Sequence, residues 1–175
     1  MNDAPAFSRP VRVGTLPSEP IERAIEAEAE ERAALAALYR LPMIAKLAAT
    51  FAVRRVGRDG ARVAGHVHAE FTQVCVVSLE PFPATLDERV DVRFAPPDEA
   101  DETRRGEMMA LDEEDPPDPI VDGVIDLGAL AAEFFALALD PYPRKPGVSF
   151  APPAAESESA SPFAALPQWQ EKPRG

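Results

Sequence analysis

The chain has 175 residues, among them 20 prolines and one cysteine, and its formal net charge is −12. This length can bury one sizeable core, while the acidic balance disfavours contact with DNA and other phosphate backbones unless arginines cluster. No run of about eighteen apolar residues exists, the N-terminus lacks a secretory pattern, and one cysteine cannot form an internal disulfide. We therefore expect a cytoplasmic protein without a membrane span.

The first third of the chain predicts a short strand followed by a helix. Residues 7–13 alternate as in a strand, and Pro10 restricts that strand to a sheet edge. Ser18 followed by Pro20 is typical of a helix start, and residues 21–40 are mostly strong helix formers. We expect one helix that ends before a proline.

Three alternating stretches then predict an antiparallel meander. Residues 47–53 and 61–75 are separated by Asp59-Gly60, a pair suited to a tight turn with positive φ. In the second stretch the apolar residues and Cys75 share one face, and polar residues share the other. Residues 86–94 repeat the alternation, as expected of neighbouring antiparallel strands with one wet face.

The second half predicts an acidic loop, a short strand, a helix and a tail. The stretch from residue 98 to 118 contains ten acidic residues and only two basic ones, and prolines flank it. Residues 96–119 are therefore expected to form a mobile loop. Residues 121–125 resemble a strand, and Asp126 is a good N-cap for a helix with an apolar face. The face is expected to consist of Leu127, Leu130, Phe134 and Leu137, with Phe135 beside them.

These elements predict one α+β domain at residues 7–150, with an antiparallel sheet covered by two helices. The sheet is expected to be open or curled toward a barrel. Residues 151–175 are low in apolar content and predict a flexible tail, within which residues 161–169 form a short docking motif.

Three segments resemble the YceD-like family, the large ribosomal RNA subunit accumulation proteins. They are GHVHAEFTQVCVVSLEP at 65–81, the stretch from IDLGALAAE to LALDPYPRKPG at 125–147, and SPFAAL at 161–166. Their order and spacing agree with the family, and the α-proteobacterial branch is the most similar. The resemblance implies a role in 23S rRNA accumulation and large-subunit assembly, with a ribosomal protein or a pre-50S particle as partner. It implies no catalytic residues.

The resemblance also marks residues with a structural role in the family signatures. These residues are Cys75, Leu79, Pro81, Asp126, Leu127, Pro141 and Pro143. Many family members carry C-x-x-C at the first signature and further cysteines at the second, which suggests metal binding. Here those positions read Cys75-Val-Val-Ser78 and PRKP, and one thiolate cannot build a tetrahedral site. We expect no metal or cofactor, and a buried Cys75 that packs as a small hydrophobe.

Two groups of residues are candidates for binding partners. Arg54, Arg55, Arg58 and Arg62 surround the predicted turn and form the local basic density that could contact RNA or an acidic protein, although a solvated hairpin tip is the simpler interpretation. Phe163, Leu166 and Trp169 recur every third residue in the polar tail and predict docking, either on the chain's own domain or on a partner.

Two chemical interpretations are weaker. His66 and His68 lie two apart on the polar face, yet no third metal ligand has a recognisable spacing, so polar decoration is favoured. The sequence contains no G-x-S-x-G, no phosphate-binding glycine loop and no H-E-x-x-H, so an enzyme is not expected.

The predicted function is a non-catalytic assembly factor that acts mainly through protein contacts. The alternative is a small-molecule or acyl-chain binding module with a cavity between sheet and helices.

Overall fold

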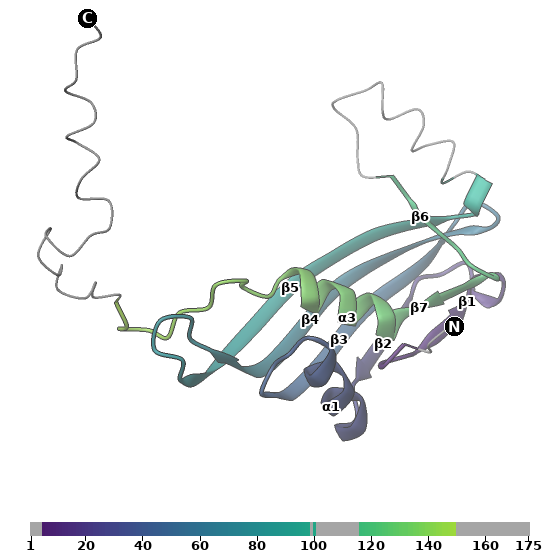
Figure 1. Cartoon of the computed structure of the whole chain (residues 1–175). Coiled ribbons are helices and arrows are strands. Elements are labelled where there is room, and N and C mark those ends of the chain that lie inside the picture. The colour runs from purple at the N-terminus through teal and green to yellow at the C-terminus, as the bar shows by residue number, and fades with distance from the viewer. Residues whose placement is uncertain (1–4, 99, 101–115, 150–175) are drawn as a thin grey trace, which may run out of the picture. The chain divides into compact units, whose positions relative to one another are not determined.

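The computed structural model describes residues 5–98, 100 and 116–149 (Figure 1). Its contacts divide the chain into two units, Met1–Lys145 and Pro146–Gly175, and every helix and strand of the described residues lies in the first unit. The elements in chain order are β1 (Pro10–Arg12), η1 (Val13–Thr15), β2 (Ile21–Glu26), α1 (Ala29–Leu38), β3 (Met43–Val56), β4 (Gly60–Val74), β5 (Pro81–Ala95), β6 (Asp118–Pro119), β7 (Val124–Asp126) and α3 (Leu127–Leu137).

A five-stranded sheet in the order β2-β3-β4-β5-β6 forms the body of the fold. Strands β2 to β5 are antiparallel neighbours, whereas β6 runs parallel to the end of β5. A second, two-stranded sheet joins β1 to β7 near the N-terminal end of α3. The α+β class and the antiparallel meander are confirmed, and the sheet is open and not curled into a barrel.

Both helices cover the apolar face of the large sheet. Alternation along β4 buries the side chains of one face, as the sequence predicts, and within that face only Gly65 is half-buried. The buried residues are Ala61, Val63, Val67, Ala69, Phe71 and Gln73. The Phe135 ring stands edge-on to Phe71 of β4 at 5.2 Å and to Tyr39, beside α1, at 5.8 Å. These aromatic contacts fix the two helices against the sheet and against each other.

The apolar face of α3 differs from the predicted one. Leu127 and Leu130 are buried as expected, but Phe135 and not Leu137 faces the core, and Leu137 is 75% exposed. The buried set is Leu127, Gly128, Leu130, Ala131, Ala132 and Phe135. Helical periodicity gave the correct element, but only the packing against Phe71 selected which of two adjacent phenylalanines faces the core.

The predicted helix over residues 21–40 is wrong in its first part. Residues Ile21–Glu26 form β2, paired with β3 so that Ile21 lies opposite Val53 and Ile25 opposite Ala49. Local propensity favours a helix there, but a strand satisfies the open edge of β3, and tertiary pairing outweighs propensity. The helix itself starts only at Ala29, where Glu28 and Glu31 form a capping box.

The turn between β3 and β4 is formed by residues 57–59, whereas the sequence predicted Asp59-Gly60. Gly60 already pairs with Val56, and the residue with positive φ is Gly57, at 62°. A Cβ at Gly60 would lie 2.9 Å from the backbone oxygen of Val56, so this glycine allows close strand approach and does not form the bend.

The predicted loop at 96–119 contains regular secondary structure at both ends. A helical turn begins at Pro97, where the Ala100 N–H donates to the Pro96 oxygen, and residues Asp118–Pro119 form β6. The strand expected at 121–125 lies instead at Val124–Asp126, preceded by a tight bridge from Val121. Residues 99 and 101–115 of the acidic segment lie outside the described residues.

Candidate functional site

Arginines gather at the hairpin end of the sheet's open face. Strand register places Arg54, Arg62 and Arg93 side by side on β3, β4 and β5. Arg89 lies further along β5 on the same face, opposite His66 and beyond Asp91. Neighbouring strands are about 4.8 Å apart, so these side chains present closely spaced cations. The sequence identified the first two. Arg89 and Arg93 were missed because they lie about 30 residues away and only the strand register brings them close.

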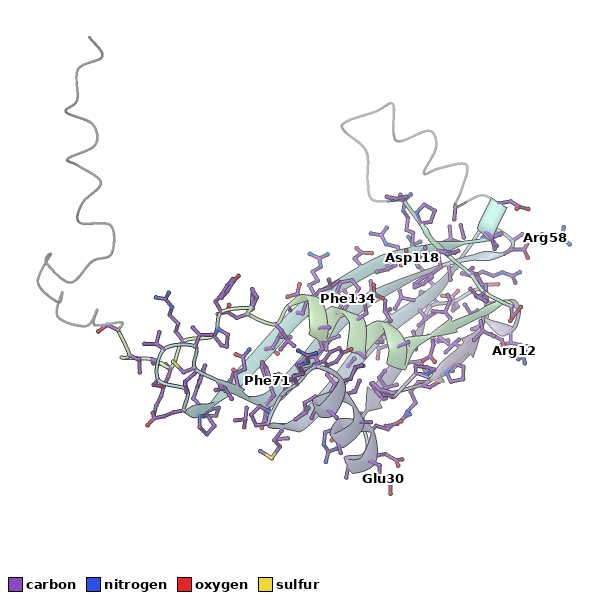
Figure 2. All side chains as sticks on the ribbon, in the orientation of Figure 1. Arg12, Glu30, Arg58, Phe71, Asp118 and Phe134 are labelled. Atoms are coloured by element: carbon purple, nitrogen blue, oxygen red, sulfur yellow. The ribbon has the colours of Figure 1, made fainter. Side chains whose placement is uncertain are left out.

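Internal bonds hold part of this basic cluster. Arg62 donates to both carboxylate oxygens of Asp91, at 2.6 and 2.7 Å, and this bond lowers the pKa of Asp91 below its usual value. Arg58 lies at the hairpin tip (Figure 2). Its backbone oxygen accepts a hydrogen bond from the Arg55 side chain. The predicted set of Arg54, Arg55, Arg58 and Arg62 is therefore brought to one end of the sheet, with two members engaged in fixing its geometry.

His66 and His68 of β4 lie on the same open face of the sheet. The Nδ1 atom of His68 lies 2.7 Å from Asp87, and Glu70 lies 3.6 Å from Nε2. The bond to Asp87 raises the pKa of His68. Within the described residues no group of three His, Cys, Asp or Glu side chains is placed to hold a metal ion. The His68 contacts are those of an exposed polar face.

The two signature segments meet at the opposite end of the sheet, around Cys75. The Val76 N–H donates to the Pro143 oxygen at 2.9 Å, and Lys145 forms a 2.8 Å ion pair with Glu80. The turn is closed by the Cys75 N–H donating to Glu80 and by the Leu79 N–H donating to Cys75. Hydrogen bonds and an ion pair thereby join two segments about 65 residues apart into one corner.

The Cys75 thiol is buried and accepts several hydrogen bonds. The Ser78 side chain and its backbone N–H, 3.5 Å from the sulfur, lower the pKa of Cys75 to about 6, with a further contribution from the Lys145 N–H. Burial agrees with the sequence prediction. The pattern of N–H donors around the sulfur is an additional feature that strand parity could not reveal.

This corner also exposes apolar side chains. Leu79 is 76% exposed and has a positive φ of 58°, a conformation that costs a branched side chain free energy. Tyr142 is 72% exposed. The set, which we call the apolar corner, consists of Val74, Val76, Leu79 and Tyr142. Exposed apolar groups gathered in one place are typical of protein-binding surfaces.

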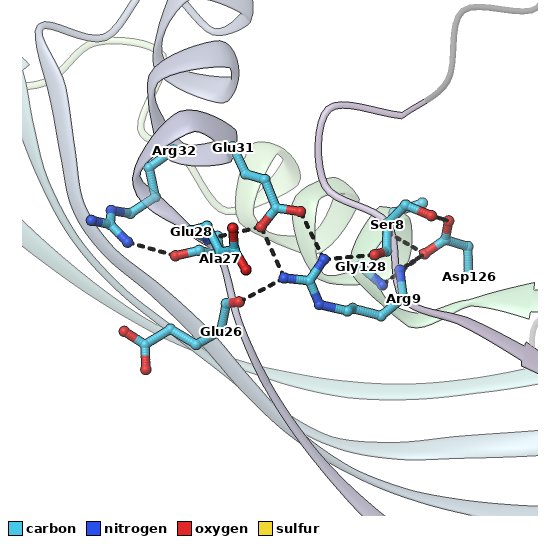
Figure 3. A network of polar contacts seen from close by, with 10 residues as sticks. Ser8, Arg9, Glu26, Ala27, Glu28, Glu31, Arg32, Asp126 and Gly128 are labelled. Carbon is cyan, nitrogen blue, oxygen red and sulfur yellow. Dashed lines mark hydrogen bonds and ion pairs between the residues drawn. The ribbon is translucent and has the colours of Figure 1, made fainter.

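Asp126 and Leu127 have structural roles. The Asp126 carboxylate caps α3 by accepting the N–H groups of Gly128 and Ala129, and it also binds the Ser8 hydroxyl and the Arg9 N–H (Figure 3). Leu127 is buried in the core. Pro81 begins β5, and Pro141 is an exposed residue after α3. The tail candidates Phe163, Leu166 and Trp169 lie outside the described residues.

The space predicted for a ligand between sheet and helices contains the rings of Phe71, Phe135 and Tyr39. Among the surface cavities of the described residues, two are lined by α3. An apolar one of about 440 Å³ opens between α1 and α3, and a mixed one of about 590 Å³ lies between α3 and the edge of β5. No helix among the described residues is long and apolar enough to cross a membrane.

The fold and these surfaces define an α+β protein with an open sheet, a basic end and an apolar corner. The family model described as "Large ribosomal RNA subunit accumulation protein YceD" matches residues 63–168, and the chain belongs to this family. Its name assigns the family a role in accumulation of the large-subunit ribosomal RNA. No curated protein and no solved structure matches the chain.

Proposed function

We propose that this protein is a non-catalytic factor that supports 23S rRNA accumulation and large ribosomal subunit assembly in the cytoplasm, mainly through protein contacts. Family membership supports the process. The partner is a ribosomal protein or a pre-50S particle. The functional unit is the domain at residues 7–150, followed by a tail at 151–175, and the chain belongs to the α-proteobacterial branch of the family.

The observation that carries the protein-contact mechanism is the apolar corner. It exposes Leu79 in a strained backbone conformation, on a turn anchored by hydrogen bonds to Pro143 and Cys75. A strained, exposed leucine has no stabilising role for the domain itself, since a smaller polar residue would fit this φ better. A binding role accounts for it.

Two further contacts are part of the proposal. The four arginines around the hairpin tip make a small contact with RNA phosphates, because guanidinium groups pair well with phosphate oxygens; they are Arg54, Arg55, Arg58 and Arg62. Phe163, Leu166 and Trp169 of the tail dock on a partner. Both contacts are secondary to the apolar corner.

The test is complementation of a host strain depleted of the protein. The 23S to 16S rRNA ratio and the amount of 50S particles on sucrose gradients are expected to fall on depletion and to recover with the wild-type chain. Leu79→Asn should fold normally, since asparagine tolerates positive φ, yet fail to restore 50S particles. Val121→Asn, at another exposed apolar residue, is the matched control and should complement.

Pulldown from lysate with and without residues 161–175 tests the tail. Loss of the same ribosomal partner is expected when the tail is absent. If depletion leaves the rRNA ratio unchanged, the assembly function is wrong. If Leu79→Asn complements as well as Val121→Asn, the apolar corner is not the binding surface.

A further inference from the structure

The outer edge of β5 is a long strand edge that the sheet leaves largely open. Among the described residues its only strand partner is β6, which pairs in parallel with Phe94 and Ala95 (Figure 1). No other strand of the described part pairs with this edge between Thr85 and Asp91. That stretch is about 20 Å long, enough for a peptide of roughly six residues.

The direction of the backbone groups on this edge follows from one hydrogen bond. The Ile120 N–H donates to the Ala95 oxygen at 2.8 Å, so the polar groups of Ala95 face outward. Groups of alternate residues point to opposite edges, and the β4–β5 register has no shift, so Thr85, Asp87, Arg89 and Asp91 also face outward.

The prolines of β5 agree with this assignment. Pro81 and Pro83 alternate in step with Thr85 and Asp87, so their backbone also points to the outer edge. Proline lacks the N–H that a partner strand would need there. They end the usable edge on one side, and β6 ends it on the other. Between them the strand offers unshielded donors and acceptors, a feature that proteins usually cover or interrupt.

A groove borders the end of the open edge nearest β6, beside Arg89 to Arg93 of β5. The cavity of about 590 Å³ has an apolar side formed by Val92 and by Phe134 and Leu137 of α3. In an added strand every second side chain would point into this groove, and the others would lie over the open face. A strand edge beside a helix is the geometry of peptide recognition by β-strand addition.

The charges beside the edge favour a basic segment. Five carboxylates lie on or beside this part of the edge, against three guanidinium groups, and at least two of the five already have partners, Asp91 in Arg62 and Asp87 in His68. They are Asp87, Glu88, Asp91, Asp118 and Glu133, with Arg62, Arg89 and Arg93. The chain as a whole carries a formal charge of −12, which also attracts basic partners.

A second copy of β5 fits this edge less well. In an antiparallel pair of β5 strands, every Asp lies opposite an Arg in only one register. That register puts Asp87 of one copy opposite Arg93 of the other, and Arg89 opposite Asp91. In that register Leu86 of the second copy would lie opposite Phe94, where β6 already pairs. The strand of the second copy would continue into the position of β6.

We propose that the edge of β5 from Thr85 to Asp91, together with the α3 groove, binds an extended basic peptide segment of a partner protein as an added strand. The inference rests on the proposed assembly function, in which a basic ribosomal protein supplies the segment. Main-chain hydrogen bonds provide affinity, and an alternation of apolar and basic side chains provides specificity.

The test uses the full chain and a fluorescent six-residue peptide in which lysine alternates with valine. A control peptide has three lysines followed by three valines, so that its charge is the same. Saturable binding of the alternating peptide is expected, at least roughly tenfold tighter than that of the control. Hydrogen exchange should show protection by the peptide at Thr85–Asp91.

Two pairs of variants locate the site. Leu137→Lys should weaken binding roughly tenfold, whereas Leu38→Lys, at a leucine of similar exposure on α1 outside this groove, should not. Arg89→Pro removes an outward N–H and should abolish binding, whereas Arg89→Ala keeps the N–H and should bind. Both leucines are exposed, so the first pair stays informative if the proline variant unfolds.

Three results would overturn the inference. They are no saturable binding up to about 1 mM peptide, equal effects of the two lysine variants, or a dimer in sedimentation whose exchange protection covers Thr85–Asp91. If the peptide fails while the protein still restores 50S particles, the edge proposal falls and the assembly function stands. If the peptide binds but depletion leaves 23S rRNA unchanged, the assembly function falls.

Discussion

Replacing Asp126 with alanine tests the junction that joins the N-terminal segment to α3. The carboxylate accepts four hydrogen bonds, from Gly128, Ala129, Arg9 and Ser8, at 2.9, 3.2, 2.7 and 2.5 Å. Loss of the N-cap costs about 1 kcal/mol. The two bonds to the N-terminal segment add about 1 kcal/mol each. The free energy of unfolding should therefore fall by roughly 3 kcal/mol.

Urea denaturation followed by circular dichroism measures this change. The midpoint should fall with an unchanged slope, and a loss of about 3 kcal/mol corresponds to a melting temperature roughly 10 °C lower. Asp59→Ala is the matched control, since this aspartate lies on the exposed hairpin tip, and it should change stability by less than about 0.5 kcal/mol.

Asp126→Asn separates geometry from charge. Asparagine keeps an acceptor oxygen for the helix N-terminus, so it should recover about half of the loss. If the alanine variant is as stable as the control, the cap does not hold the N-terminal segment, and the reasoning is wrong. If asparagine is as destabilising as alanine, the carboxylate charge and not the cap is responsible.

Four further predictions concern single side chains. Gly65→Ala should lower the free energy of unfolding by roughly 3 kcal/mol, because its Cβ would lie 2.0 Å from a backbone oxygen of β3; an unchanged denaturation midpoint would contradict this. A pKa of about 6 for Cys75 predicts that its stabilising contribution is present above pH 9 and is lost as pH falls through about 6. Thiolate absorbance should titrate accordingly, and Ser78→Ala should raise the pKa. Cys75→Ala should leave partner binding intact, checked by pulldown at matched stability. Because folding raises the pKa of His68, this group stabilises the fold at pH values below the pKa of the unfolded histidine, and the contribution is lost as pH rises through the pKa of the folded one. Asp87→Asn should lower the His68 pKa in an NMR titration, and an unchanged pKa would refute the ion pair.

Several parts of the fold could be predicted from local patterns alone. Alternation identified β3, β4 and β5, because one wet face and one buried face impose a period of two. Asp126 was recognisable as a cap since its side chain acts on N–H groups two and three residues ahead. The burial of Cys75 followed from its parity on the strand.

The candidate surfaces were only partly predictable. Arg54 and Arg62 surround one turn, so proximity in sequence revealed them, whereas Arg93 joined them only through the β4–β5 register. The apolar corner depends on contacts between segments about 65 residues apart, as in the bond from Val76 to Pro143. No local pattern contains information about such pairs.

The sequence by itself determined the elements with a strong period, the helix cap and the family. Tertiary structure decided what depends on distant partners. Residues Ile21–Glu26 have helical propensity, yet they form β2 because β3 offers a row of unpaired backbone groups. The open edge of β5 is a further case, since whether a strand has one neighbour or two is a property of the sheet. Propensity differences of a few tenths of a kcal/mol per residue are smaller than the free energy of burying and pairing a strand, and pairing therefore prevails.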